Sequence, residues 1–282
     1  MLRSPPMNLL ATITQLSHEF GTPDFVKGGG GNTSCKNADT LWVKPSGTTL
    51  SGLAPEKFVA MGRRKLGRLY DAAMPANSAA REALVKDLMA AAVLPGSNGR
   101  PSVEAPLHDI LPGTFVVHTH ATLVNGLTCA RNGAATCARL FPEALWIPYI
   151  DPGFTLCMDV RRRLTRQRLV ILENHGIFVA GDTAEEIRGT YQRVLGALRT
   201  EYAKAGIPTD LKPGQLPTEP EPVTPDHMVY TRHPVLGPQM AADCALIRQL
   251  ADAFGGMQLL DERSQKFIRE WEVEAYRQKQ VA

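Results

Sequence analysis

The chain has 282 residues, a formal net charge of +3, 44% hydrophobic residues and 21% charged residues. These values are typical of a globular protein with one large domain, or a domain with an appendage, and they allow a substantial core. Basic residues cluster in GRRKLGR and RRRLTRQR, but no aromatic residues are interleaved with them, which argues against nucleic acid as a partner.

The sequence shows no sign of a membrane segment or an export signal. No run of about twenty apolar residues is present, and MLRSPPMNLL lacks the long apolar core of a signal peptide. The five cysteines are odd in number and lack CxxC spacing, which argues against a disulfide framework and a structural zinc site. We therefore expect reduced cysteines and a cytoplasmic protein with no membrane partner.

Hydrophobic periodicity and turn residues predict a mixture of helices and strands. The predicted elements, in chain order, are a helix at about 9–20, the strand-like run TLWVKPSG between two polar turns, a helix at 80–94, a short helix in SVEAPLHDIL with Ser102 as its N-cap, a strand at 115–120, a strand at about 144–150, a buried strand at 168–176, and a helix from Asp182 to Gly206. Because strands and helices do not alternate strictly, this pattern predicts an α/β or α+β layer fold.

The composition changes after Gly206. Residues 208–225 contain six prolines, which predict an extended linker. The helical stretches expected beyond it are too short to bury a core of their own, so we expect them to dock on the main body or on a neighbouring subunit. The predicted units are a catalytic domain at 1–206, a Pro-rich linker at 207–237 and a helical C-terminal extension at 238–282, with helices at about 238–254 and 260–279.

Two histidines, His118 and His120, stand one residue apart at the end of the apolar run FVVHTH. Side chains alternate along a strand, so the two imidazoles share one face while Thr119 points to the other. A single buried histidine is usually a core residue, but a pair in one pocket favours a metal site if a third ligand exists.

The segment ENHG supplies this third ligand. His175 precedes a glycine at the end of an apolar strand, from where a side chain can project over the sheet edge into a cleft. Three imidazoles leave a position open for water or substrate, as in a catalytic metal site. Zinc is the first expectation, and imidazole ligands also suit manganese, cobalt and iron.

Glu104 lies on the short helix that precedes the histidine strand, so the chain would return it close to His118. A glutamate at the start of a helix is also a common capping or solvent-exposed residue. Next to a divalent cation it would ligate the metal in the absence of substrate and act as a general base when substrate displaces it.

Two loops of small residues, GGGGNTS and PSGTT, flank one predicted strand. Their backbone N–H groups can approach an anion closely, and the amide of Asn32 and nearby hydroxyl groups can donate to it. Lys27 and Lys44 would add positive charge. The candidate phosphate or substrate residues are Gly31, Asn32, Thr33, Lys44, Ser46, Gly47, Thr48 and Ser102.

These motifs, in this order, resemble the class II aldolase/adducin family over about residues 9–204. The segments that carry the resemblance are GGGGNTS, KPSGTT, PSVE, HTH, IPY and ENHG. The resemblance implies a three-layer α/β/α fold with a central, mostly antiparallel sheet, followed here by a helical tail. It also implies a homo-oligomer, with a tetramer favoured, whose active sites lie between subunits.

The resemblance also assigns roles to residues of this chain. His118, His120 and His175 would hold the metal, Glu104 would be the catalytic acid/base, and Tyr149 would assist protonation of the aldehyde. Asn32, Ser46, Gly47 and Ser102 would hold a phosphate.

The resemblance is strongest to the aldolase portion of bifunctional rhamnulose-phosphate aldolase/dehydrogenase chains, judged from SVEAPLHDILP and TPDHMVYTRHP. We expect no dehydrogenase domain here, because the chain ends first. Two departures from the fuculose enzymes, Val103 in place of a second serine and a shorter helix before HTH, bear on phosphate affinity and sugar identity.

These assignments predict a lyase of carbohydrate metabolism: a metal-dependent aldolase that cleaves a ketose 1-phosphate to dihydroxyacetone phosphate and an aldehyde. The alternatives within the family are a sugar-phosphate epimerase, a dehydratase and a β-keto acid decarboxylase. Glu104 counts against the epimerase, which typically carries aspartate there. A non-catalytic, adducin-like structural protein is a further alternative, which the three histidines disfavour.

Overall fold

A seven-stranded sheet forms the centre of the computed structural model, which describes residues 7–211 and 221–270. The strand order is β3-β2-β1-β4-β7-β6-β5, and every neighbouring pair is antiparallel except β5 and β6. The strands are β1 (Asn32–Lys36), β2 (Thr40–Val43), β3 (Val59–Gly62), β4 (Phe115–Thr119), β5 (Leu145–Ile147), β6 (Leu169–Leu172) and β7 (Gly176–Gly181). The middle strand β4 therefore lies between β1 and β7.

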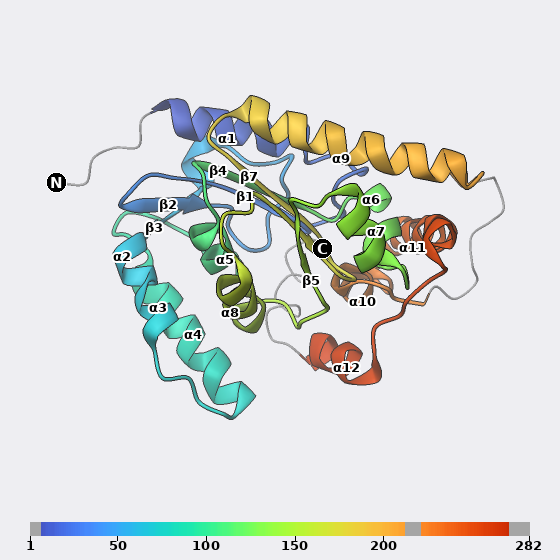
Figure 1. Ribbon diagram of the computed structural model, residues 1–282. Coiled ribbons are helices and arrows are strands. Elements are labelled where there is room, and N and C mark those ends of the chain that lie inside the picture. Colours follow the sequence, from blue (N-terminus) through green and yellow to red (C-terminus); the bar gives the residue numbers. More distant parts are fainter. Residues whose placement is uncertain (1–6, 212–220, 271–282) are drawn as a thin grey trace.

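Helices cover both faces of this sheet, as Figure 1 shows. The long helices α1 (Met7–Glu19) and α9 (Ala184–Lys204) lie across one face, and α5 (Ala105–Ile110) and α8 (Phe154–Arg163) lie on the other. Alternate side chains of β4 pack into the core on opposite faces of the sheet: Val117 packs on the α1 and α9 side, and Val116 packs on the α5 and α8 side. The predicted three-layer fold with a mostly antiparallel sheet is confirmed.

The remaining helices pack around the sheet and the four helices named above. Within the described residues they are α2 (Arg63–Leu66), α3 (Arg68–Asp71), α4 (Ser78–Ala92), α6 (Thr122–Thr128), α7 (Gly133–Leu140), α10 (Pro225–Tyr230), α11 (Gly237–Ala251) and α12 (Glu262–Glu270), with 3-10 turns at Pro55–Lys57 and Asp252–Phe254. In the described part of the chain, no helix is both long enough and apolar enough to span a bilayer.

Two sequence predictions near β7 need correction. The strand expected at 168–176 ends at Leu172, and a turn leads into β7, which the sequence analysis did not identify. The N-cap of α9 is Thr183, whose hydroxyl accepts from the Glu186 N–H. Asp182 instead forms an ion pair with Arg168, because its side chain lies on the strand side of the turn.

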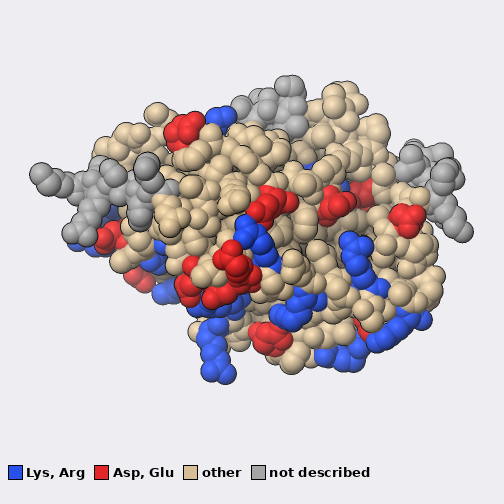
Figure 2. All heavy atoms as spheres, turned by 90° about the horizontal axis from the view of Figure 1, so that it is seen from above, with Lys and Arg blue, Asp and Glu red and all other residues tan. Residues whose placement is uncertain are grey.

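The basic clusters of the sequence contact carboxylates of the protein itself. Arg63 pairs with Asp109, and Arg162 and Arg163 pair with Asp159 one turn earlier on α8. On the face seen from above in Figure 2, Lys and Arg side chains are interspersed with Asp and Glu side chains rather than gathered into one basic area. These basic residues thus stabilise local structure.

The segment after Gly206 is not an extended linker throughout. Residues 225–230, inside the predicted linker 207–237, form α10, because Thr224 caps the helix and Pro225 occupies its first turn. The helices predicted at 238–254 and 260–279 correspond to α11 and α12, and the part of the prediction beyond residue 270 lies outside the described residues, as do residues 212–220 of the predicted linker. We call residues 221–270 the C-terminal segment.

A buried polar network joins the C-terminal segment to the main body. Lys27 Nζ lies 2.6 Å from Asp243 Oδ1 and donates to Thr122 Oγ1, which itself donates to Asp243. On the other side of this carboxylate, His227 Nε2 lies 3.0 Å from Asp243 Oδ2, and His227 Nδ1 lies 3.0 Å from Thr224 Oγ1. Lys27, expected to serve an anion site, therefore has a structural role.

Both titratable partners in this network are held in their charged forms. Burial opposes the charge on His227, but hydrogen bonds to Asp243 and Cys244 outweigh it and raise the pKa of His227 to about 10. Burial likewise opposes the charge on Asp243, but Lys27 and His227 lower its pKa to about 2. The imidazolium and the carboxylate are thus a buried ion pair at neutral pH.

This network predicts a specific pH dependence of stability. The pKa of His227 rises from about 6.5 in an unfolded chain to about 10 on folding. The stabilisation that protonated His227 adds to the free energy of unfolding is therefore complete below pH 6.5 and is lost as the pH rises to about 10. Urea unfolding at a series of pH values should show this decline in the wild type and a weaker decline in His227→Gln. Thr200→Ala, which removes an exposed hydroxyl with no titratable group, should keep the wild-type slope. Identical slopes in wild type and His227→Gln would contradict the assignment.

Candidate metal centre and active site

The end of β4 carries the two histidines of the HTH motif. His118 lies within the strand, paired with Asn32 of β1 on one side and Phe178 of β7 on the other, and His120 follows one residue after the strand ends. The side chain of Thr119 points to the opposite face, where its hydroxyl lies 3.0 Å from that of Tyr191. Strand alternation thus brings the two imidazoles to one side, as expected.

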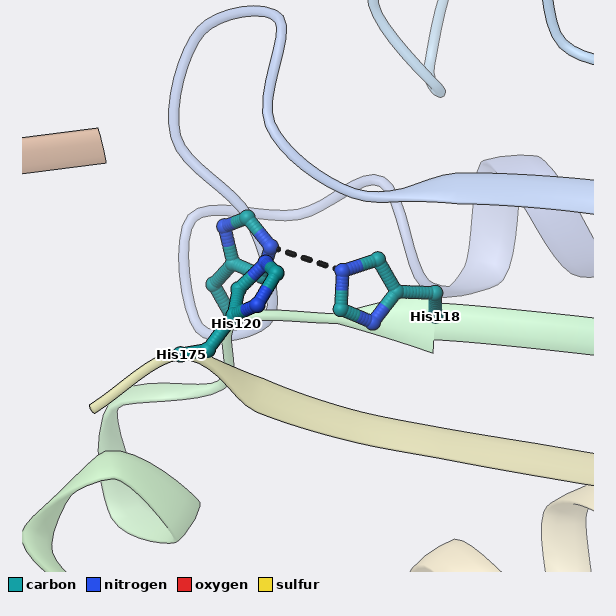
Figure 3. Close-up of side chains that lie close together, drawn as sticks. All are labelled: His118, His120 and His175. Atoms are coloured by element: carbon teal, nitrogen blue, oxygen red, sulfur yellow. Dashed lines mark hydrogen bonds between the residues drawn. The ribbon is translucent and has the colours of Figure 1, made fainter. Parts of the chain in front are cut away.

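The third histidine reaches the same place from the turn between β6 and β7. The backbone of the preceding residue, Asn174, has a φ of 49°, which directs His175 back toward the end of β4. Figure 3 shows the three rings converging; one nitrogen atom from each ring lies within 4.8 Å of the other two, and all three residues are buried. His175 thus lies in the turn and not on the strand itself.

Hydrogen-bond partners at Nδ1 orient the rings of His118 and His120. His118 Nδ1 lies 3.0 Å from the Ile177 carbonyl, an acceptor, so this nitrogen donates. His120 Nδ1 lies 2.5 Å from a carboxylate oxygen of Asp226 and donates to it. Both Nε2 atoms therefore point into the space between the rings, where they form the 2.9 Å hydrogen bond drawn in Figure 3.

Burial keeps the rings of His118 and His175 neutral. Burial, and then the neighbouring His120, lower the pKa of His118 far below its usual range. Burial likewise lowers the pKa of His175 to about 3, despite the opposing charge of Glu104. A neutral imidazole is the form that coordinates a metal ion. This buried histidine triad therefore fits a divalent metal.

Glu104 provides a carboxylate beside the triad. Its Oε2 lies 3.5 Å from His118 Nε2, and its Oε1 lies 3.6 Å from His175 Nε2. Asn32 Nδ2 donates to Oε2 at 2.7 Å, whereas Oε1 is buried and makes no hydrogen bond within the described residues. A buried carboxylate oxygen without a donor is costly unless a cation or substrate satisfies it. This oxygen fits the metal or proton-transfer role expected of Glu104.

Ser102 does not cap the short helix. The N-cap of α5 is Glu104, without a side-chain cap, because the helix begins only at Ala105. Ser102 Oγ instead accepts from the Glu104 N–H at 3.3 Å and from Asn32 Nδ2 at 3.2 Å. Since the hydroxyl accepts in both bonds, its own hydrogen is left to donate into the cavity.

The sequence analysis missed His108, which controls the orientation of Asn32. His108 Nε2 contacts Asn32 Oδ1, and His108 Nδ1 lies 2.7 Å from Ser34 Oγ. Because an amide oxygen only accepts, this histidine donates through Nε2 and turns the Asn32 amide hydrogens toward Glu104 and Ser102. The sequence feature that could have identified His108 is its position four residues after Glu104, because residues with this spacing lie on the same face of a helix.

One cavity joins the metal-binding candidates to the two glycine-rich loops. Lys44 is buried beside it and donates to the Gly29 carbonyl at 2.9 Å, so a positive charge lies next to the cavity. Gly47, with a φ of 80°, gives the second loop the left-handed turn that glycine adopts most readily. The cavity is lined by Gly29, Gly31, Asn32, Lys44, Ser46, Gly47, Ser102, Val103, Glu104, His120, Pro152, His175 and Pro225.

Four predicted site residues do not line this cavity. One of them, His118, is fully buried next to the lining residues His120 and Glu104. The Thr33 hydroxyl contacts Ser17 of α1, because strand alternation turns it away from Asn32. Thr48 Oγ1 donates to the Pro45 carbonyl within its own turn. Tyr149 borders a different, larger cavity beside Asp151 and Glu173.

A carboxylate from the C-terminal segment also belongs to the site. Asp226 on α10 contacts His120, although the sequence analysis placed it in the linker. The sequence Thr-Pro-Asp is itself a helix-start signal and would have predicted α10. No local pattern indicates that Asp226 contacts the HTH motif, because the two are far apart in the sequence.

Comparison with known proteins places this fold and site in one family. Residues 11–200 match the sequence model of the family described as Class II Aldolase and Adducin N-terminal domain. The chain therefore belongs to the class II aldolase and adducin family. Class II aldolases use a divalent metal, and members of the family act on phosphorylated sugars and are commonly oligomeric.

Individual relatives agree in fold. The structure of the N-terminal class II aldolase domain of a conserved protein from Thermoplasma acidophilum has 26% identity and a TM-score of 0.60, and the match covers 71% of this chain and 94% of that one. An L-fuculose 1-phosphate aldolase structure shares the fold at 15% identity and a TM-score of 0.51, with 73% and 90% coverage.

One curated relative is considerably longer than this chain. The protein named "Uncharacterized oxidoreductase YuxG" from Bacillus subtilis (strain 168) is 28% identical over 184 residues. The match covers 61% of this chain and 26% of that protein. The chain thus spans about a quarter of the length of this relative.

The triad predicts loss of metal on removal of one ring. His175→Ala deletes an imidazole carried by a turn, so the fold should survive while bound metal falls well below one equivalent per chain. Elemental analysis after extensive dialysis measures this content. His18→Ala, whose ring contacts the Leu53 carbonyl instead, should retain the wild-type content. Equal metal in wild type and His175→Ala would remove this histidine from the ligand set.

Proposed function

We propose that the chain is a metal-dependent aldolase that cleaves a ketose 1-phosphate into dihydroxyacetone phosphate and an aldehyde. The observation that supports it best is the convergence of His118, His120 and His175, beside a cavity that His120, His175, Glu104 and the glycine-rich loops line. An inert scaffold has no need of three converging imidazoles. Zinc is the first candidate metal, with manganese, cobalt and iron as alternatives.

The chemical difficulty is the enediolate left when the C3–C4 bond of the ketose breaks. The bonding electrons move toward the C2 carbonyl oxygen, and the C4 hydroxyl loses its proton as the aldehyde forms. A divalent cation held by the three histidines, when bound, supplies Lewis acidity to substrate oxygen atoms. The chain's own groups must then orient the substrate and move protons.

Glu104 is the proposed proton carrier at C3. Asn32 holds its Oε2, so Oε1 is the oxygen available to deliver a proton to C3 of the enediolate and complete dihydroxyacetone phosphate. In the condensation direction the same oxygen removes this proton. Because Glu104 also lies 3.5 Å and 3.6 Å from two of the histidines, it is placed where charge develops in the transition state.

The phosphate site is proposed at the two glycine-rich loops. Both Asn32 amide hydrogens already face Glu104 and Ser102, so we assign the phosphate to the Lys44 charge, the Ser46 and Ser102 hydroxyls, and the backbone of Gly31 and Gly47. Remote binding of the phosphate fixes the reacting carbons relative to Glu104.

Tyr149 is proposed to assist proton transfer at the aldehyde oxygen. It lies outside the cavity of a single chain, so this role requires a homo-oligomer, with a tetramer favoured, in which Tyr149 faces the site of a neighbouring copy. Product analysis with a panel of ketose 1-phosphates separates the aldolase from an epimerase, a dehydratase or a decarboxylase, because only the aldolase releases both fragments.

Replacing Glu104 by glutamine should separate chemistry from binding. Glu104→Gln keeps the size of the side chain but removes the base, so kcat should fall by about 10²–10⁴-fold with little change in KM. Exchange of the C3 proton of dihydroxyacetone phosphate with deuterated solvent should stop in the metal-loaded variant. Exchange at the wild-type rate would mean that another residue is the base.

The phosphate site predicts a strong preference for phosphorylated substrates. Two or three charge-assisted hydrogen bonds should favour the 1-phosphate by about 3 kcal/mol, roughly a hundredfold in kcat/KM. Ser46→Ala should reduce this ratio, whereas Thr48→Ala should not, because its hydroxyl bonds within its own turn. Equal kcat/KM for a ketose and its 1-phosphate would redirect the assignment to an unphosphorylated substrate.

A further inference from the structure

The C-terminal segment packs against the candidate metal centre at several points. It lies outside residues 11–200, which carry the family match, yet Pro225 lines the cavity that contains His120 and His175. The segment thus covers the candidate site from one side.

The first contact point is His120. This residue follows the end of β4, so strand pairing does not fix its ring as it does for His118. Asp226 Oδ2 lies 2.5 Å from His120 Nδ1, with both side chains buried. Accepting this proton fixes the tautomer that leaves Nε2 facing the other two rings.

The second contact point is the turn that carries His175. Asn174 Nδ2 donates to the carbonyls of Val223 and Gln258, each at 2.9 Å. The side chain of Gln258 donates to Glu173 on the same turn, and its backbone N–H donates to the Cys129 carbonyl at 2.7 Å. The left-handed conformation at Asn174 is thus held by residues of the C-terminal segment.

The third contact point is the first glycine-rich loop. A Cβ at Gly30 would collide with Asp226 Oδ2, and one at Gly28 would collide with the Leu236 side chain. The run of glycines therefore allows the C-terminal segment to approach this loop closely. This role is separate from the proposed binding of an anion by the loop.

We propose that Asp226 is a positioning residue of the metal centre, which orients His120 through its Nδ1–H, and that the C-terminal segment is an integral part of this centre. The inference rests on the proposed metal site. Carboxylates that accept from metal-bound histidines raise the basicity of the ring and hold it in place, and their loss typically weakens metal binding about 10–100-fold.

Docking of the segment does not explain Asp226. Lys27, Asp243 and His227 already join the segment to the main body through a separate buried network, and Asn174 adds two more hydrogen bonds. A carboxylate needed only for docking would have no reason to contact a histidine of the triad. Removal of Asp226 is therefore expected to affect the metal more than the fold.

The test compares metal affinity in three full-length variants. Asp226→Ala removes the acceptor, and Asp226→Asn keeps a neutral one. Asp261→Ala removes a carboxylate of the same segment that caps α12 through the Ser264 N–H. Zinc affinity is measured by competition with a chromogenic chelator, the visible spectrum of the Co²⁺-loaded protein reports ligand geometry, and thermal unfolding without metal reports the fold.

We expect Asp226→Ala to bind zinc about 10–100-fold more weakly and to change the Co²⁺ spectrum. Asp226→Asn should lose less zinc affinity than Asp226→Ala. Asp261→Ala should match the wild type in both zinc affinity and the Co²⁺ spectrum. Wild-type zinc affinity and a wild-type Co²⁺ spectrum in both Asp226 variants would overturn the role of Asp226 but not the proposed metal site. An equal loss of zinc affinity in Asp261→Ala would do the same. No zinc binding by the wild type would overturn the proposed metal site as well. If Asp226→Ala does not fold, Asp226→Asn decides by the same criteria.

Discussion

The placement of His118 and His120 on one face at the end of β4 is the constraint on which the candidate site depends. Each ring donates through Nδ1, to the Ile177 carbonyl and to Asp226 respectively, so the two Nε2 atoms point toward the same place and lie 2.9 Å apart. A metal ion bound by both Nε2 atoms would replace this contact between the rings. The surrounding structure holds the rings in this orientation, as a preorganised metal site requires.

The register of the central sheet transmits this constraint to the catalytic carboxylate. Because Asn32 lies opposite His118 in the β1–β4 pair, its amide reaches Glu104, and His108 fixes the direction in which this amide points. A register shift by one residue would turn these side chains to the opposite face, where Thr119 lies. The sheet and the short helix α5 thus place ligand and base within one cavity.

Local patterns predicted the parts of the site that depend on strand geometry. The shared face of His118 and His120 follows from the period of two along β4, and the same rule would have excluded Thr33, which adjoins Asn32 on β1. The N-cap role predicted for Ser102 was wrong. Serine is a favoured N-cap residue, but here its hydroxyl accepts a hydrogen bond from Asn32 instead. The layer architecture followed from the mixture of helical and strand periods together with the family resemblance.

Long-range contacts were beyond sequence reasoning. Asp226 lies 106 residues after His120, and no periodicity connects α10 with the end of β4. The prolines after Gly206 predicted a linker, and the composition gave no sign that the chain returns to cover the cavity with Pro225. Side chains that orient other side chains, such as Asp226 and His108, are set by tertiary packing and leave only weak signals in sequence.

The central claim is that one divalent cation is bound by the three converging histidines. Anomalous diffraction from crystals of the zinc-loaded protein, collected on both sides of the zinc absorption edge, locates the ion directly. The account predicts a single strong peak about 2.0–2.1 Å from the Nε2 atoms of His118, His120 and His175. A peak at another place, or none at the triad while zinc binds elsewhere, would contradict it.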